Sequence, residues 1–211
     1  SSSVGVQAVE SADSLVEGVP VPAMSAIESA FCRSAPWRSF AARSVLPWAL
    51  DGETLRDHVL EIGGGSGAMA AGVARRFPEG ALSVTDMDAA MVESARRRLS
   101  NYPNLTVERA DVTALPFDTQ SFGTVTSYLM LHHVIHWMDA LAEVTRVLKA
   151  GGVFVGYDLT DTRIARWLHQ ADASPHHIIA PEELSHGLAA AGFTQVSVRL
   201  SAAGHLMRFR A

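Results

Sequence analysis

Short apolar runs alternate with segments of helical periodicity from residue 58 to the end of the chain. Five runs rich in β-branched residues predict strands at 59–62, 81–85, 105–107, 124–128 and 153–157. Two further runs, at 195–200 and 205–210, are separated by residues 201–204 alone. This short connection predicts a hairpin, so one of the two strands is expected to run antiparallel.

Helical periodicity fills the intervals between the strands, at 68–77, 88–99, 137–148 and 181–192. Asp88 is placed to cap the second helix, and Gly151-Gly152 is expected to end the third. Strands that alternate with helices imply parallel pairing through right-handed crossovers. Residues 58–211 therefore predict one α/β domain: a Rossmann-like, doubly wound sheet of seven strands, mostly parallel with an antiparallel C-terminal strand, and helices on both faces.

The N-terminal part of the chain follows a different pattern. Residues 1–22 are rich in Ser, Gly and Pro and poor in large apolar groups, which is typical of a flexible segment. Residues 23–57 are expected to form a helical arm or lid, with short helices at 24–34 and 37–48. Pro47 is expected to limit the second of these helices.

Composition sets limits on the class of protein. The 211 residues are 48% apolar and 18% charged, which fits one globular domain with a hydrophobic core. The net charge of −5 argues against general nucleic-acid binding, which needs clustered cations. Cys32 is the only cysteine, so the chain forms neither an internal disulfide nor a thiolate zinc site.

No membrane segment is predicted. The apolar runs fall short of the ~18 residues that a membrane-spanning helix needs. The first residues carry neither the positive start nor the apolar stretch of a signal peptide. We therefore expect a cytoplasmic protein, and the sequence leaves monomer and homodimer open.

The glycine-rich segment 61–67 is the strongest candidate site. It consists of Glu-Ile-Gly-Gly-Gly-Ser-Gly, between a predicted strand and a predicted helix. Ligands of open α/β sheets bind beyond the carboxyl ends of the strands, where glycines let the backbone turn tightly and approach the ligand. On this segment alone, a dinucleotide site built on Gly63, Gly65 and Ala68 and a turn without a ligand both remain open.

Three acidic residues narrow the choice. Glu61 precedes the first glycine by two positions, where a carboxylate repels a pyrophosphate but can hold an ammonium group. Asp86 ends the second predicted strand and can accept hydrogen bonds from ribose hydroxyls. Asp111 follows the third strand and can accept one from an adenine amine. Together they fit a cationic ligand that contains an ammonium group, a ribose and an adenine.

With these residues in place, the chain resembles the class I S-adenosylmethionine-dependent methyltransferases, in the small-molecule branch that includes the quinone-biosynthesis methyltransferases. The resemblance covers about residues 58–211 and rests on six blocks in the family's order, at 59–67, 84–91, 111–117, 129–133, 146–152 and 188–193. The chain departs from the family at Gly123, where aspartate is usual, and at Ala150, where proline is usual. We expect only local effects on stability at both positions.

The resemblance implies S-adenosylmethionine as cofactor and S-adenosylhomocysteine as product. It implies that Glu61 and the glycines border the methionine part and that Asp86 binds the ribose. Asp111, with the backbone N–H of Val112 beside it, is expected to reach the adenine amine. The implied cofactor-binding residues are Glu61, Gly63, Gly64, Gly65, Gly67, Asp86, Met87, Asp111, Val112 and Ser127.

The residues around the fourth predicted strand are candidates for catalysis. The resemblance implies that Ser127 and Tyr128 line the space near the methyl group, and that Met87 packs on the adenine. His132 and His133 follow the same strand, where the acceptor should bind, and the ordinary imidazole pKa of roughly 6.5 suits a general base. We hypothesise that His133, His132 and Tyr128 are catalytic, while a packing role for each histidine remains open.

The remaining candidates concern a metal and the acceptor. His132 and His136 have the i, i+4 spacing of two zinc ligands, but no His-Glu-x-x-His pattern and no third ligand are evident, so we expect no metal. The connection 158–180, which contains Arg163, His176 and His177, is the expected lid over the acceptor, although an ordinary surface role for it remains open. The run 96–98 is expected to form the solvated face of a helix. Aromatic walls for the acceptor are expected from Trp37, Tyr128, Trp137, Tyr157 and Trp167.

The predicted reaction is transfer of a methyl group to an O, N or C atom of a small, partly apolar molecule by in-line displacement. The cofactor carries the reactivity, and the protein supplies alignment and a dry site. The Asn/Asp-Pro-Pro-aromatic motif of amino-group nucleic-acid methyltransferases is absent after the fourth strand, which favours a small-molecule acceptor. Two alternatives remain: a non-catalytic module that binds S-adenosylmethionine, and an NAD-dependent oxidoreductase, which leaves Asp111 unexplained.

Overall fold

The computed structural model describes residues 40–162 and 177–211. The predicted helix at 24–34 and the candidates Trp37, Arg163, Trp167 and His176 lie outside the described residues. Within the described ranges, no helix is long and apolar enough to cross a membrane.

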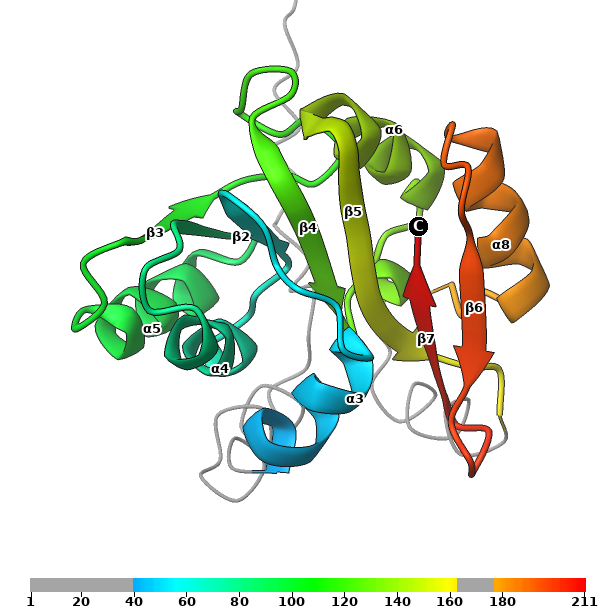
Figure 1. The fold of residues 1–211 in the computed structure, drawn as a ribbon, viewed down its shortest axis with the longest axis horizontal. Coiled ribbons are helices and arrows are strands. Elements are labelled where there is room, and N and C mark those ends of the chain that lie inside the picture. Colours follow the sequence, from blue (N-terminus) through cyan, green and yellow to red (C-terminus); the bar gives the residue numbers. More distant parts are fainter. Residues whose placement is uncertain (1–39, 163–176) are drawn as a thin grey trace, which may run out of the picture.

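A sheet of seven strands forms the centre of the fold, in the order β3-β2-β1-β4-β5-β7-β6 (Figure 1). The five strands from β3 to β5 pair in parallel, and β7 pairs antiparallel with both β5 and β6. The predicted fold class is therefore confirmed, including the antiparallel strand near the C-terminus. The strands are β1 Val59–Ile62, β2 Leu82–Asp86, β3 Leu105–Arg109, β4 Phe122–Tyr128, β5 Leu148–Leu159, β6 Ser197–Leu200 and β7 Leu206–Arg210.

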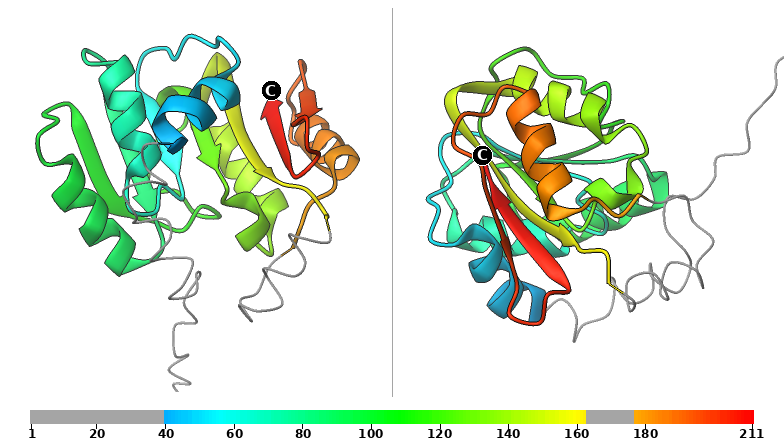
Figure 2. Two further views of the ribbon diagram at one scale, coloured as in Figure 1. Left: turned by 90° about the horizontal axis from the view of Figure 1, so that it is seen from below. Right: turned by 90° about the vertical axis from the view of Figure 1, so that its right-hand side faces the viewer.

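Helices cover both faces of the sheet (Figure 2). The α-helices are α3 Leu46–Leu50, α4 Ala68–Arg76, α5 Ala89–Leu99, α6 Trp137–Val147 and α8 Pro181–Ala190. A π-helical turn, η1 (Ala41–Val45), precedes α3, and a short 3₁₀ turn, η2 (Leu131–His133), follows β4.

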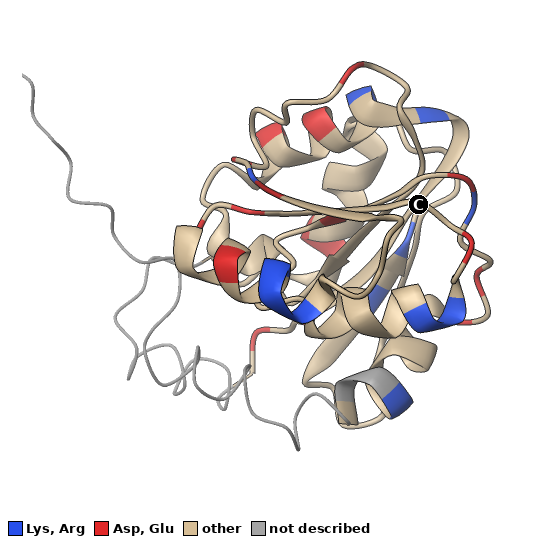
Figure 3. Ribbon diagram, turned by 90° about the vertical axis from the view of Figure 1, so that its left-hand side faces the viewer, with Lys and Arg blue, Asp and Glu red and all other residues tan. Residues whose placement is uncertain are grey.

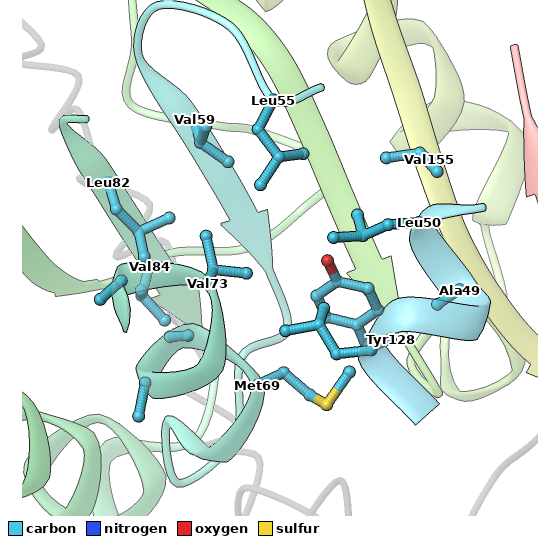
Figure 4. Packing of buried hydrophobic residues seen from close by; sticks show 14 of the residues in the cluster. Ala49, Leu50, Leu55, Val59, Met69, Val73, Leu82, Val84, Tyr128 and Val155 are labelled. Carbon is cyan, nitrogen blue, oxygen red and sulfur yellow. The ribbon is translucent and has the colours of Figure 1, made fainter. Parts of the chain in front are cut away.

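Two hydrophobic clusters lie on the two faces of the sheet. On one face, α3, α4 and α5 pack over Val59 and Val84. Figure 4 shows the part of this cluster that α3 and α4 contribute. On the other face, α6 and α8 pack over Leu60 and Ile62. Successive side chains of a strand point to opposite faces, so β1 supplies both clusters: Val59 belongs to the first, and Leu60 and Ile62 belong to the second. This central strand leads directly into the glycine-rich segment.

Three local expectations can be compared with the structure. Asp88 caps α5 as predicted, because its side chain accepts hydrogen bonds from the backbone N–H groups of Ala90 and Met91. The expectation for Gly151-Gly152 is wrong: α6 ends at Val147, and β5 begins at the next residue. The expectation for Pro47 is also wrong, because this proline lies in the first turn of α3, where its missing N–H costs nothing.

Candidate functional site

A pocket of about 300 Å³ lies at the carboxyl ends of the parallel strands. The predicted residues Gly63, Gly65, Asp86, Met87, Asp111, Val112 and His133 line it. Its remaining wall is mostly apolar and includes Met91, Leu129, Met130, Val134 and Ile135. A second hollow of about 420 Å³, lined by residues 148–153 and 192–195 among others, contains none of the predicted site residues. The first pocket is therefore the candidate site.

The glycines of the loop after β1 serve different purposes. Gly63 and Gly65 have φ angles of 61° and 52°, in the region that disfavours other residues. A Cβ on Gly63 would lie 2.0 Å from Met130 Cγ, whereas a Cβ on Gly65 would meet nothing within 4 Å. Gly64 faces away from the pocket, and a Cβ on it would lie 2.4 Å from Val84 Cγ1. Gly65 thus presents bare backbone to the pocket, while Gly64 and Gly67 allow close packing behind the loop.

Asp86 ties the glycine loop to the end of β2. Its Oδ2 accepts a hydrogen bond from the Gly65 backbone N–H at 2.8 Å, and its Oδ1 accepts one from the Asp88 N–H at 2.9 Å. Burial raises the pKa of this carboxyl, and these two backbone donors oppose that rise. The arrangement holds an acid group at the pocket wall directly beside the glycine loop.

Met87 and Asp111 also line the pocket. The Met87 side chain is half exposed, which is unusual for a large apolar group next to a buried strand. Asp111 Oδ1 accepts hydrogen bonds from the backbone N–H and the hydroxyl of Thr113, at 2.9 and 2.8 Å. These bonds fix the turn after β3, and with it the backbone of Val112 at the pocket wall.

Glu61, Ser127 and Tyr128 are buried and do not line the pocket. Glu61 is only 1% exposed, and burial raises the pKa of its carboxyl to about 8, although the Ala70 backbone N–H favours the ionised form. Among the described residues, Glu61 Oε2 and Ser127 Oγ have no hydrogen-bond partner. Tyr128 packs with Met69 and Leu50 in the cluster of Figure 4. Burial and the charge of Glu61 raise the pKa of the Tyr128 phenol well above its ordinary value of 10.

The two adjacent histidines of η2 have different environments. His133 lines the pocket, whereas His132 is 2% exposed and pairs with Asp158 at the end of β5. Their ring centroids are 4.0 Å apart. His136 also lines the pocket, and the backbone N–H of His177 donates to the His132 carbonyl at 2.7 Å. No group of three or more potential metal ligands comes together within 40–162 and 177–211.

The expectation that residues 96–98 form a solvated face is wrong for Arg98. Its Nη1 donates to the hydroxyl of Ser66 at 2.7 Å and also to the Ser66 carbonyl, so α5 holds the glycine loop from behind. Arg96 donates to the Val107 carbonyl at 3.1 Å, and only Arg97 keeps to a surface ion pair, with Glu93. Sequence reasoning missed Arg98 because nothing in its local pattern distinguishes it from its neighbours.

The expected aromatic walls are not found among the described residues. Tyr128, Trp137 and Tyr157 are buried in the hydrophobic clusters and do not line the pocket. A Cβ on Gly187 of α8 would lie 2.3 Å from the Trp137 ring, so this glycine makes room for the indole in the core. Methionines and aliphatic side chains take the place of aromatic rings at the apolar wall.

Comparison with known proteins agrees with this arrangement. Residues 59–152 match the family described as a methyltransferase domain. A demethylmenaquinone methyltransferase of Clavibacter sepedonicus is 33% identical over 193 residues, which cover 80% of this chain and 76% of that protein. A ubiquinone/menaquinone biosynthesis C-methyltransferase of Bordetella parapertussis is 41% identical over 97 residues, but this match spans only 37% of its length.

A solved structure shares the fold at low sequence identity. A SAM-dependent methyltransferase from Aquifex aeolicus matches 82% of this chain and 92% of its own, with a TM-score of 0.66 and 17% identity. At this identity the likeness shows a common fold, and the Clavibacter relative shows the family. The chain therefore belongs to the class I S-adenosylmethionine-dependent methyltransferases, enzymes that take S-adenosylmethionine as their cofactor.

Proposed function

We propose that this methyltransferase transfers a methyl group to an O, N or C atom of a small, partly apolar molecule by in-line displacement. The observation that carries the proposal is the pocket at the strand ends. It combines three carboxylates, those of Asp86, Asp88 and Asp111, with bare glycine backbone, an apolar wall and the imidazoles of His133 and His136. The carboxylates and the exposed backbone of the glycine loop can form hydrogen bonds with the polar cofactor, and the apolar wall can contact an apolar acceptor.

The residues of the pocket fit S-adenosylmethionine, which supplies an activated methyl group on a sulfonium. Asp86 would accept hydrogen bonds from the ribose hydroxyls, because a carboxylate can accept more bonds than the two that it receives from the backbone. Asp111 and the backbone of Val112 would hold the adenine edge, and Met87 would cover its face.

Glu61 is proposed to attract the ammonium group at the methionine end of the cofactor. Its Oε2 is buried and has no hydrogen-bond partner among the described residues. When the carboxyl is ionised, a nearby cation would therefore stabilise it. Gly63 and Gly65 would lie between this carboxyl and the ligand, and Ser127 would lie nearby at the end of β4.

The acceptor would bind against Leu129, Met130, Val134 and Ile135, with His133 beside it. The names of the relatives, demethylmenaquinone methyltransferase and ubiquinone/menaquinone C-methyltransferase, support an acceptor with an apolar ring. His133 would take the proton of a nucleophile that must lose one, as an imidazole can near neutral pH.

The test is methyl transfer from labelled S-adenosylmethionine to three acceptor classes: a naphthohydroquinone, a simple phenol and an alkyl amine, with mass spectrometry of the product. We expect label in an apolar ring compound, and its position in the product identifies the atom. Tight cofactor binding with no transfer to any class would favour the non-catalytic binding module. Cofactor binding by NAD(H) instead would favour the oxidoreductase.

A further inference from the structure

A buried acid–imidazole pair lies directly behind the acceptor side of the pocket. Asp158 and His132 are 1% and 2% exposed. The His132 Nδ1–H donates to Asp158 Oδ1, and the His132 backbone N–H donates to Asp158 Oδ2 at 3.2 Å. One carboxylate at the end of β5 therefore holds both the ring and the main chain of His132.

The pair is joined to the pocket through a ring contact. The His132 and His133 centroids lie 4.0 Å apart with 41° between the ring planes, and His133 lines the pocket. Both residues belong to η2, a three-residue 3₁₀ turn with little stability of its own. The direction of the His133 ring must therefore be set by contacts from outside the turn.

A third element meets the pair from the other side. The His177 backbone N–H donates to the His132 carbonyl at 2.7 Å, and the His177 ring lies 3.0 Å from Glu183 Oε1 at the start of α8. His132 is thus fixed by β5 through Asp158 and by the segment before α8 through its carbonyl. Burying a carboxylate is unfavourable unless it is well paired, and replacing such a pair by apolar residues is often neutral or stabilising. A need for stability alone does not explain this pair.

We propose that Asp158 is a positioning residue for methyl transfer: it fixes the tautomer and orientation of His132, which in turn holds the His133 ring at the acceptor side of the pocket. The proposal rests on the proposed function of the pocket. Because Asp158 Oδ1 accepts the Nδ1–H, the neutral His132 ring carries its proton on Nδ1 and presents Nε2 as an acceptor. Asp158 does not itself touch the pocket.

The first test needs no acceptor. In protein labelled with ¹⁵N-histidine, long-range ¹H–¹⁵N spectra identify the tautomer of each ring, with His132→Gln and His133→Gln for assignment. We expect the Nδ1–H form for His132 at pH 7. In Asp158→Asn, we expect loss of that tautomer and a changed His133 signal. The matched control is Glu53→Gln, which alters another shielded carboxylate, paired with Arg210 on β7. It should leave both histidines unchanged.

The second test separates positioning from a general loss of structure. We expect Asp158→Asn to bind S-adenosylhomocysteine within about twofold of wild type but to lower kcat at least tenfold. In a His133→Ala background, Asp158→Asn should lower kcat less than twofold, because the ring through which Asp158 acts is absent. Additive losses, an Nε2–H tautomer in wild type, or His133 signals indifferent to Asp158→Asn would overturn the proposal. Wild type without any methyl transfer would contradict the proposed function instead, and the spectra would still decide the role of Asp158.

Discussion

Asp86 is the residue on which the cofactor assignment depends most. Its carboxylate already receives two backbone hydrogen bonds, one of them from the glycine loop, and it borders the pocket. Asp88, two positions later, also borders the pocket, but its Oδ1 accepts both of the hydrogen bonds that cap α5. The two acids therefore have separate tasks, although both follow the same strand.

We predict that Asp86→Ala weakens binding of S-adenosylhomocysteine by at least about tenfold. The variant loses one to three hydrogen bonds to the ribose, each worth roughly 1 kcal/mol, and also releases the Gly65 N–H. Isothermal titration calorimetry measures the change. Glu93→Ala, on the exposed side of α5, is the control and should bind as wild type. Equal affinity in Asp86→Ala would remove this residue from the site.

Glu61 makes the stability of the free protein depend on pH. Its folded-state pKa of about 8 lies above the ordinary 4.5, so the folded state holds a proton that the unfolded state has lost between these pH values. The carboxyl therefore destabilises the fold progressively as pH rises from 4.5 to 8. Glu61→Gln, which resembles the protonated form, should be more stable than wild type by an amount that grows across this range to on the order of 4 kcal/mol. Urea unfolding at pH 5 and pH 8 checks this, and a constant difference would contradict it.

The glycine loop is held in place by two elements, β2 from the front and α5 from behind. Gly64 N–H donates to the Thr85 carbonyl at 2.9 Å, and Arg98 of α5 binds Ser66. Gly67 allows α5 to approach, since a Cβ there would lie 2.9 Å from Leu99 Cδ1. The shape of the loop before ligand binds is thus a property of its packing as well as of its glycines.

Arg98→Met should weaken binding of S-adenosylhomocysteine about threefold to tenfold, because the loop loses its anchor at Ser66 while the apolar stem of the side chain is kept. Arg97→Met is the matched control: it removes a neighbouring cation that pairs only with exposed Glu93, a contact worth little. Fluorescence or calorimetric titration compares the two. Equal affinities in both variants would mean that α5 does not position the loop.

The elements and the first contacts of the site follow from the sequence, and the long-range contacts do not. The strand before Gly63 and the helix cap at Asp88 depend only on residues close to them in the sequence, so periodicity and capping rules predict them. Arg98 meets Ser66 only after α4 and β2 have folded between them. Asp158 meets His132 because β4 and β5 lie side by side. No local sequence pattern predicts such contacts between residues that are far apart in the sequence.

Over the whole molecule, charge and shape agree with a small-molecule enzyme. The net charge is −5, and Lys and Arg are interspersed with Asp and Glu on the side drawn in Figure 3. The pocket lies at the end of the sheet where Asp86, Asp111 and η2 come together, beside the glycine loop. The fold thus brings residues from four separate loops to one place.

The most direct test of the account is thermal unfolding of the whole chain with S-adenosylhomocysteine and with NADH in parallel. Ligand at 100 times its dissociation constant adds about 2.7 kcal/mol to the stability of the folded state. For a chain of this length that corresponds to a rise in Tm of roughly 5–10 °C. The account predicts this rise with S-adenosylhomocysteine, a rise of about half that size or less in Asp86→Ala at the same ligand concentration, and none with NADH. A rise with NADH alone, or none with S-adenosylhomocysteine, would contradict the assignment of the pocket.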